Sequence, residues 1–193
     1  MSWITGMDVS ILLFIQEHIR MDVMNPFWKG ITALGDAGLF WIILGIILLI
    51  PRKTRKVGWM VLLSLALGAL ITNVTLKNLV ARIRPYDLVN TIVPLVAKPV
   101  DFSFPSGHTC ASFASAEVYY RMLPKKYGIS AMILAGMIAF SRMYVGVHYP
   151  TDVIGGILVG LASGAIVCYG MNRIEEKREG ENRNDIGNTK DTD

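Results

Sequence analysis

Three ionisable side chains stand close together between two apolar runs, in the stretch S-R-M-Y-V-G-V-H-Y-P-T-D from Ser141 to Asp152. Arg142 can bind an anion through two parallel hydrogen bonds, which a lysine cannot do. His148 can act as a nucleophile or a base near neutral pH. Asp152 follows four residues later and can hold that imidazole in one tautomer. Ionisable residues in apolar segments are usually functional, so the stretch predicts nucleophilic chemistry on an anion; a polar membrane boundary is the alternative.

A second cluster, F-P-S-G-H, comes directly before the apolar run that begins at His108. Ser106 is a good N-cap residue, and Gly107 lets the backbone come close to a ligand. Free amides at a helix N-terminus, together with the helix dipole, suit a phosphate. His108 would stand within reach of whatever binds there. An ordinary capped turn is the alternative, because P-S-G-H alone is weak evidence.

A third cluster, K-N-L-V-A-R-I-R-P, holds three cations within eight residues: Lys77, Arg82 and Arg84. Lys77, Arg84 and Pro85 fit the spacing K-x6-R-P. The three cations are kept apart from the basic loops elsewhere in the chain, which favours anion binding. Taken singly, Lys77 and Arg82 could equally well be membrane anchors whose side chains reach into the headgroup region.

The composition predicts an all-α, polytopic transmembrane helical bundle. Apolar residues make up 52% of the 193 residues, the mean hydropathy is +0.44, and the apolar residues fall in blocks rather than stripes. The net charge of +4 does not argue for nucleic acid, because basic residues are expected beside membrane spans and no basic run is interleaved with aromatics. Cys110 and Cys168 lie far apart in apolar runs, so we expect reduced, packed thiols.

The chain divides into three parts. Residues 1–36 are expected to form an N-terminal interfacial segment with a helix over 8–20, capped by Asp8 or Ser10 and too polar to span. Residues 37–172 form the transmembrane domain, and residues 173–193 a charged tail that is disordered beyond one or two helical turns. Five spans are expected: Leu39–Ile50, Val57–Leu76, His108–Leu123, Gly128–Val147 and Val153–Met171. Whether the chain has a sixth span is left open.

The distribution of basic residues predicts the topology. The loops 51–56 and 124–127 and the tail share one side and are basic, which places them in the cytoplasm. The three clusters then lie on the opposite face, so the site faces outward. The cations of the segment 77–108 run against this rule, and we interpret them as ligand-binding residues.

The three motifs in this order resemble those of the type 2 phosphatidic acid phosphatase superfamily, which includes membrane lipid phosphatases and soluble vanadium haloperoxidases. The motifs bracket residues 77–152 and match at every fixed position. These positions are Lys77, Arg84 and Pro85; Pro105, Ser106, Gly107 and His108; and Ser141, Arg142, His148 and Asp152.

The resemblance implies a division of labour among these residues. His148 would attack phosphorus and form a phosphohistidine, with Asp152 orienting its ring. His108 would protonate the leaving oxygen and then activate water. The phosphoryl oxygens would be held by Lys77, Arg84, Ser106, Gly107 and Arg142. No metal or other cofactor is implied, and the sequence offers no cluster of carboxylates to hold a metal.

The implied function is that of an integral, multi-pass cell-membrane phosphatase acting on a lipid phosphate or diphosphate. Undecaprenyl diphosphate is slightly preferred, and phosphatidylglycerophosphate or phosphatidate is the alternative. An anion-binding transporter or structural protein is the non-enzymatic alternative, and a haloperoxidase is disfavoured because those relatives are soluble. The oligomeric state is open. Glu117 is expected to be a structural group or part of the headgroup cavity, and Asp101 to shape the loop or to be solvated.

Overall fold

The computed structural model describes residues 3–190, without the side chains of residues 179 and 182–190. The described backbone contains helices and no strand, so the prediction of an all-α fold is confirmed. Two short π-helical segments, η1 (Ile15–Ile19) and η4 (Leu70–Leu76), continue α1 and α4. The helices are α1 (Trp3–Phe14), α2 (Asn25–Ala33), α3 (Leu39–Leu49), α4 (Arg55–Ala69), α5 (Lys77–Val80), α6 (Pro85–Leu88), α7 (Gly107–Met122), α8 (Lys125–Tyr144) and α9 (Pro150–Lys190).

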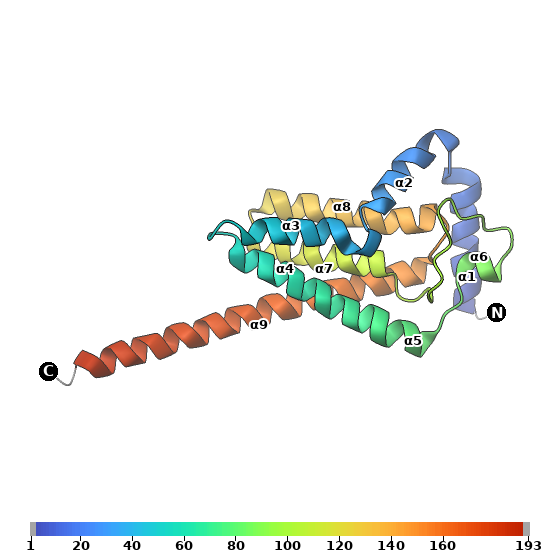
Figure 1. Ribbon diagram of the computed structural model, residues 1–193. Coiled ribbons are helices and arrows are strands. Elements are labelled where there is room, and N and C mark those ends of the chain that lie inside the picture. The colour runs from blue at the N-terminus through green and yellow to red at the C-terminus, as the bar shows by residue number, and fades with distance from the viewer. Residues whose placement is uncertain (1–2, 191–193) are drawn as a thin grey trace.

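Helix α7 packs against α4, α8 and α9, while α3 packs against α4 (Figure 1). Helices α1, α2 and α6 gather at one end of this bundle, and α9 extends beyond the other end (Figure 1). The first end carries the N-termini of α7 and α9, the C-terminus of α8 and the segment after η4. The three sequence clusters are therefore brought to the same end of the molecule.

A row of glycines on α9 allows it to lie against the backbone of α7. A Cβ atom on Gly156, Gly160 or Gly164 would come within 2.7, 2.6 and 2.8 Å of the carbonyl oxygens of Ser106, Cys110 and Ala114, respectively. Small residues spaced four apart let helix backbones approach closely, as is common in membrane bundles. This packing fixes the N-terminus of α7 beside the first turn of α9.

We predict that Gly160→Ala destabilises the fold by about 1–3 kcal/mol, because the added methyl group would overpack the α7–α9 contact. Gly136→Ala on α8 is the matched control, since a Cβ there meets nothing within 4 Å and gains the same helix propensity. Thermal unfolding in detergent measures both variants. Equal melting temperatures for the two would contradict the packing account.

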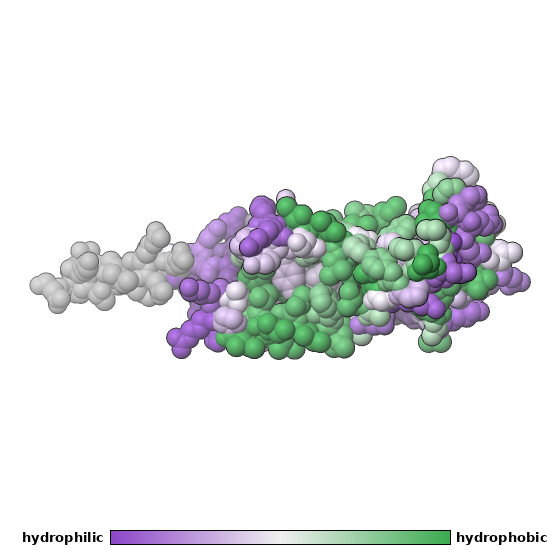
Figure 2. All heavy atoms as spheres, turned by 90° about the horizontal axis from the view of Figure 1, so that it is seen from above, coloured by the Kyte–Doolittle hydropathy of each residue, from purple (hydrophilic) through white to green (hydrophobic). Residues whose placement is uncertain are grey.

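Within residues 3–190, three helical stretches are long and apolar enough to cross a membrane: Arg55–Leu88, Lys125–Tyr144 and Pro150–Arg178. A fourth is formed if Asp22–Ala33 and Asp36–Leu49, bent by 43° relative to each other, make one broken span. On the face seen in Figure 2, apolar side chains cover the middle and hydrophilic ones gather toward both ends. These observations fit a membrane protein, and the count of five or six spans stays a prediction.

Two details of the N- and C-terminal parts differ from the expectation. Helix α1 begins at Trp3, so neither Asp8 nor Ser10 caps it, and Asp8 lies in mid-helix with no exposed surface. Helix α9 continues to Lys190, well past the one or two turns expected of the tail. Residues 191–193 lie outside the described part of the chain, and the disorder of the tail stays a prediction there. The interfacial position of α1 also stays a prediction, although Met7, Ile11 and Phe14 are exposed on it.

Candidate active site

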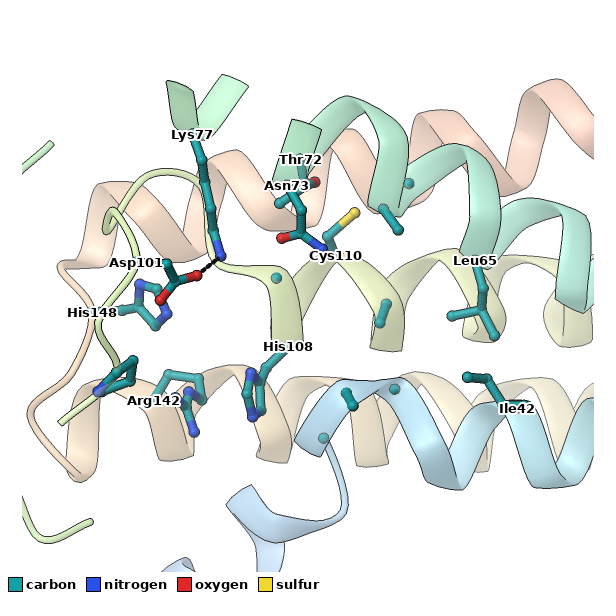
Figure 3. Close-up of a pocket in the computed structure, with 18 of the residues that line it drawn as sticks. Ile42, Leu65, Thr72, Asn73, Lys77, Asp101, His108, Cys110, Arg142 and His148 are labelled. Carbon is teal, nitrogen blue, oxygen red and sulfur yellow. Dashed lines mark hydrogen bonds and ion pairs between the residues drawn. The ribbon is translucent and has the colours of Figure 1, made fainter. Parts of the chain in front are cut away.

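A cavity of about 550 Å³ opens at the end of the bundle where the three clusters meet (Figure 3). Its polar end is lined by Lys77, Arg84, Asp101, Gly107, His108, Arg142 and His148. Its other end runs between α3 and α4 and is lined by apolar side chains, among them Ile42, Leu62 and Leu65. One continuous space thus joins a cluster of cations and imidazoles to a hydrocarbon-like interior.

The π-helical segment η4 precedes Lys77. Such segments insert an extra residue into a helical turn and are frequent at functional sites. Thr72 and Asn73 of η4 line the cavity, and the Lys77 side chain beyond them reaches Asp101 as an ion pair. Lys77 is only 8% exposed, so its ammonium faces the cavity and not the headgroup region.

The N-terminus of α7 forms the next wall of the cavity. Ser106 is its N-cap, as predicted, and its Oγ accepts hydrogen bonds from the Thr109 amide (3.5 Å) and the Thr109 hydroxyl (3.0 Å). Ser106 is buried and does not itself line the cavity. A Cβ on Gly107 would lie 3.3 Å from Asn73 Oδ1 and 3.8 Å from Lys77 Nζ, so the missing side chain leaves the backbone open beside that ammonium.

Arg84 is held rigidly by the loop that follows it. Its Nε donates to the Asp101 carbonyl at 2.7 Å, and its Nη1 donates to the Val147 carbonyl at 2.8 Å. The same Nη1 lies 3.5 Å from His148 Nε2. Because the side chain is 3% exposed and anchored on both sides, the guanidinium is fixed beside the His148 ring.

Asp101 is a site residue whose role the sequence did not indicate. Its carboxylate pairs with both Lys77 and Arg84, the latter at 2.6 Å, and so lies between two residues that are predicted to bind phosphate. Burial alone would raise the pKa of Asp101, but hydrogen bonds and charges from Lys77 and Arg84 lower it to about 2. Asp101 is therefore ionised at neutral pH and occupies the position where an anionic ligand would meet these cations. No local pattern marks it, because the pairing joins a loop residue to two distant positions.

His148 lies in the turn between α8 and α9 and is 1% exposed. Its Nδ1 is 3.5 Å from Asp152 Oδ2, which is longer than an ordinary hydrogen bond, while Nε2 faces Arg84. Burial, and then the positive charges of Arg142 and Arg84, lower the pKa of His148 to about 3. The imidazole is thus neutral at physiological pH, as a nucleophile must be.

Asp152 lies in the first turn of α9, after Pro150 at its start, as predicted. Its carboxylate is fully buried and accepts three hydrogen bonds, from Ser103 Oγ (2.5 Å), the Tyr149 amide (2.9 Å) and Arg82 Nη1 (2.6 Å). The carboxylate is therefore oriented from several sides, with Oδ2 directed toward the His148 ring.

Arg142, in the last turn of α8, is 3% exposed. Its Nη1 donates to Thr32 Oγ1 at 2.5 Å, whereas its buried Nε has no hydrogen-bond partner. Buried donors are rarely left without an acceptor. An anion in the cavity would supply one.

His108 stands across the cavity from His148 (Figure 3). Its Nε2 is 2.8 Å from Asp36 Oδ1, on the turn between α2 and α3, and this carboxylate orients the ring. Gly35 on that turn packs directly against the imidazole, because a Cβ there would lie 2.7 Å from His108 Cδ2. No spacing rule in the sequence indicates Asp36 as a partner of His108.

Three further expectations have structural outcomes. Arg82, expected to bind an anion with its two neighbours, does not line the cavity and pairs with Asp8 and Asp152. Glu117 pairs with Arg121 one turn along α7, at 2.5 Å, and does not line the cavity. The two cysteines are free and buried, as predicted. In the part of the chain that the structure describes, no group of three histidine, cysteine or acidic side chains is placed to hold a metal.

The chain is similar to proteins of known name. The sequence model of the PAP2 superfamily matches residues 57–176. An undecaprenyl-diphosphatase of Sulfolobus acidocaldarius is 38% identical over 155 residues, covering 80% of this chain and 74% of that protein. Phosphatidylglycerophosphatase B of Bacillus subtilis is 36% identical over 156 residues, covering 74% and 73%. The crystal structure of a transmembrane PAP2-type phosphatidylglycerolphosphate phosphatase from Bacillus subtilis superimposes with a TM-score of 0.75 at 31% identity, covering 90% of this chain and 89% of that one.

Proposed function

The chain belongs to the PAP2 superfamily and is a phosphoric ester hydrolase, and we propose that it is a metal-independent membrane lipid phosphatase working through a phosphohistidine. One observation carries the proposal. A buried, neutral His148 lies beside Arg84 in a cavity that also exposes Lys77, Arg142 and His108. A neutral nucleophile facing several cations is what attack on a phosphate anion requires.

In the first step, the lone pair of His148 Nε2 attacks phosphorus and the bond to the leaving oxygen breaks. His108 gives that oxygen a proton, so that the product leaves as a neutral hydroxyl or as a phosphate with one proton more. The bound substrate adds negative charge beside the His108 ring and favours its protonated form. Asp152 stabilises the positive charge that develops on the His148 ring.

In the second step, water attacks the phosphohistidine and the phosphorus–nitrogen bond breaks. His108, now neutral, takes the proton of the attacking water, and His148 leaves as the neutral imidazole. Free phosphate is released and both histidines return to their starting states. Protons and bonds balance without a metal ion.

The transition state spreads negative charge over the phosphoryl oxygens. Lys77, Arg84 and Arg142 contribute the cations, and the Gly107 amide contributes a donor at the positive end of the α7 dipole. The Ser106 hydroxyl, buried beneath this turn, is the remaining predicted ligand. Preorganised donors of this kind commonly supply the largest share of a rate enhancement.

A lipid phosphate or diphosphate fits the cavity because its two ends differ in polarity. The headgroup would meet the cations while a hydrocarbon chain enters the apolar part between α3 and α4. Undecaprenyl diphosphate is our first choice of substrate, supported by the relative named undecaprenyl-diphosphatase. Phosphatidylglycerophosphate is the second, supported by the relative named phosphatidylglycerophosphatase B.

We place the protein in the cell membrane with five crossings, made by α3 with α2, α4, α7, α8 and α9. Helix α7 packs against three helices that are candidate spans, which supports a crossing by α7 as well. The basic loops at the far end of the bundle would face the cytoplasm, and the cavity the opposite side.

Purified protein in detergent tests the function directly. It is given undecaprenyl diphosphate, phosphatidylglycerophosphate and phosphatidate, each with and without EDTA, and released phosphate is measured. We expect hydrolysis that EDTA leaves unchanged and vanadate inhibits. Release from none of the three lipids would overturn the lipid phosphatase, whereas strong inhibition by EDTA would overturn only the metal-independent mechanism.

Asp101 yields a separate prediction for this assay. Asp101→Asn should lower the inhibition constant for vanadate by about five-fold, because the anion no longer has to displace a carboxylate from Lys77 and Arg84. This magnitude follows from half-exposed ion pairs, which contribute up to about 1 kcal/mol. Asp87→Asn, an exposed carboxylate on α6, is the control. Weaker vanadate inhibition in Asp101→Asn would show that this carboxylate organises the cations instead of competing for them.

A further inference from the structure

We propose that Asp8 and Arg82 are positioning residues for Asp152, so that the N-terminal helix α1 contributes a residue that supports the active site. This inference rests on the proposed function and adds to it two residues that lie outside the matching motifs. Neither side chain lines the catalytic cavity, so neither can act by touching the substrate there.

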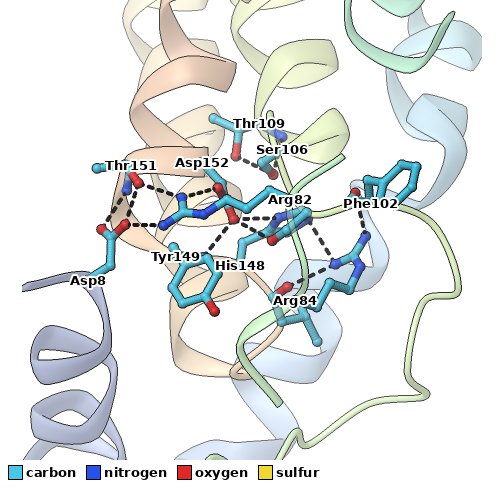
Figure 4. A network of polar contacts seen from close by, with 12 residues as sticks. Asp8, Arg82, Arg84, Phe102, Ser106, Thr109, His148, Tyr149, Thr151 and Asp152 are labelled. Carbon is cyan, nitrogen blue, oxygen red and sulfur yellow. Dashed lines mark hydrogen bonds and ion pairs between the residues drawn. The ribbon is translucent and has the colours of Figure 1, made fainter. Parts of the chain in front are cut away.

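The guanidinium of Arg82 bridges two carboxylates from distant parts of the chain (Figure 4). Its Nη2 donates to Asp8 Oδ2 at 2.6 Å, and its Nη1 donates to Asp152 Oδ1 at 2.6 Å. Nη1 also lies 2.7 Å from Thr151 Oγ1. The planar fork of an arginine fixes both partners in angle as well as in distance.

Asp8 is built into this network and is not a solvated helix residue. It has no exposed surface, although it lies near the N-terminus of the chain. Its Oδ1 accepts the Thr151 amide at 3.1 Å, and its Oδ2 accepts the Thr151 hydroxyl at 2.5 Å. A buried carboxylate is tolerated only when it is paired and hydrogen-bonded, and the partners of Asp8 among the described residues belong to Arg82 or to the first turn of α9. Asp8 therefore holds the turn that carries Asp152.

An aromatic ring also contacts the guanidinium of Arg82. Its Cζ lies 4.0 Å from the centre of the Tyr149 ring, within the range of a cation–π contact. Tyr149 is the residue after His148, and its amide donates to Asp152 Oδ2. The same guanidinium thus contacts both the nucleophile's turn and the carboxylate that orients the nucleophile.

The two carboxylate oxygens of Asp152 have different partners, which indicates the role of Arg82. Oδ1 accepts Arg82, while Oδ2 accepts Ser103 and the Tyr149 amide and faces His148. Without Arg82, Ser103 and the Tyr149 amide would be left to hold the carboxylate, and rotation about its bond to Cβ would change the approach of Oδ2 to the His148 ring. Loss of such a supporting contact should lower turnover and leave binding of the phosphate group nearly unchanged.

The test compares Asp8→Asn and Arg82→Gln with Glu17→Gln, which alters an exposed carboxylate just after α1. For each protein we would measure kcat, KM, vanadate inhibition and the melting temperature. We expect kcat to fall about 10–100-fold in the first two, as for lost supporting contacts in other active sites, with KM and vanadate inhibition within about two-fold of wild type. The double variant should be no worse than the poorer single one, because both act through Asp152.

A wild-type kcat in Asp8→Asn would overturn the inference, and so would a rise in KM equal to the fall in kcat. If Asp8→Asn fails to fold, Thr151→Val provides the test, since it removes the hydroxyl shared by Asp8 and Arg82 and keeps every charge. We expect a several-fold fall in kcat there, and an unchanged kcat overturns the inference. Wild-type protein that hydrolyses none of the three lipids would instead overturn the proposed function itself, and this inference with it.

Discussion

His148→Ala is expected to reduce kcat for phosphate release by about ten thousand-fold or more, since the covalent route through nitrogen is then closed. The effect should appear in kcat more than in binding. Lys77, Arg84 and Arg142 keep their places around the cavity, and removing the small, neutral ring takes no charge away from it. Vanadate, which mimics the pentacoordinate phosphorus, should still bind to these cations, though more weakly without the nitrogen that it bonds.

The control for this variant is His18→Ala, which removes an exposed imidazole that stacks on Phe14 outside the cavity. Its kcat should match the wild type. Release of phosphate by His148→Ala at a tenth of the wild-type rate or faster would mean that another group attacks phosphorus. The melting temperatures of both variants show whether a loss of activity reflects unfolding.

His108→Gln should give the second-largest effect, about a hundred- to ten thousand-fold on lipid substrates, the usual contribution of general acid–base catalysis. The glutamine can neither protonate the leaving oxygen nor take a proton from water. The two roles can be separated with p-nitrophenyl phosphate, whose leaving group departs without a proton. On that substrate the first step should survive and the second should stall, so one equivalent of p-nitrophenol appears in a burst and phosphate stays on the protein.

Steady release of p-nitrophenol and phosphate by His108→Gln at the wild-type rate would contradict the role of this ring in the second step. Loss of both, with no burst, would place His108 in binding or in the first step only. Asp36→Ala is a useful companion, because it removes the carboxylate that lies 2.8 Å from His108 Nε2 without altering the ring.

The parts of the site that could be predicted from sequence are those fixed by local geometry. Ser106 caps α7 because a serine before an apolar run is a strong helix start, and Pro150 begins α9 for a similar reason. His148 and Asp152 face each other because they flank one short turn. The five apolar runs became α3, α4 with η4, α7, α8 and α9, since an apolar block has few other structures available to it.

The three acidic partners could not be predicted in their roles, because each meets its cation or imidazole through the tertiary fold. Asp101 reaches Lys77 and Arg84 from a loop, Asp36 reaches His108 from the turn between α2 and α3, and Asp8 reaches Arg82 from α1. Asp8 was even expected to be a helix cap. A lone aspartate in a single sequence has no spacing rule that names a distant partner, so only the packing of α1 against α9 identifies this one.

The proposed mechanism requires a covalent bond between phosphorus and His148, and this bond can be trapped. Wild-type protein in detergent is mixed with a lipid substrate carrying radiolabelled phosphate and quenched in base within the first turnover, and the labelled peptide is identified by mass spectrometry. We expect a label that is stable in base, is lost in acid, lies on His148, and is absent from His148→Ala. Stoichiometric label on another residue, or rapid phosphate release with no protein-bound label at any time, would contradict it.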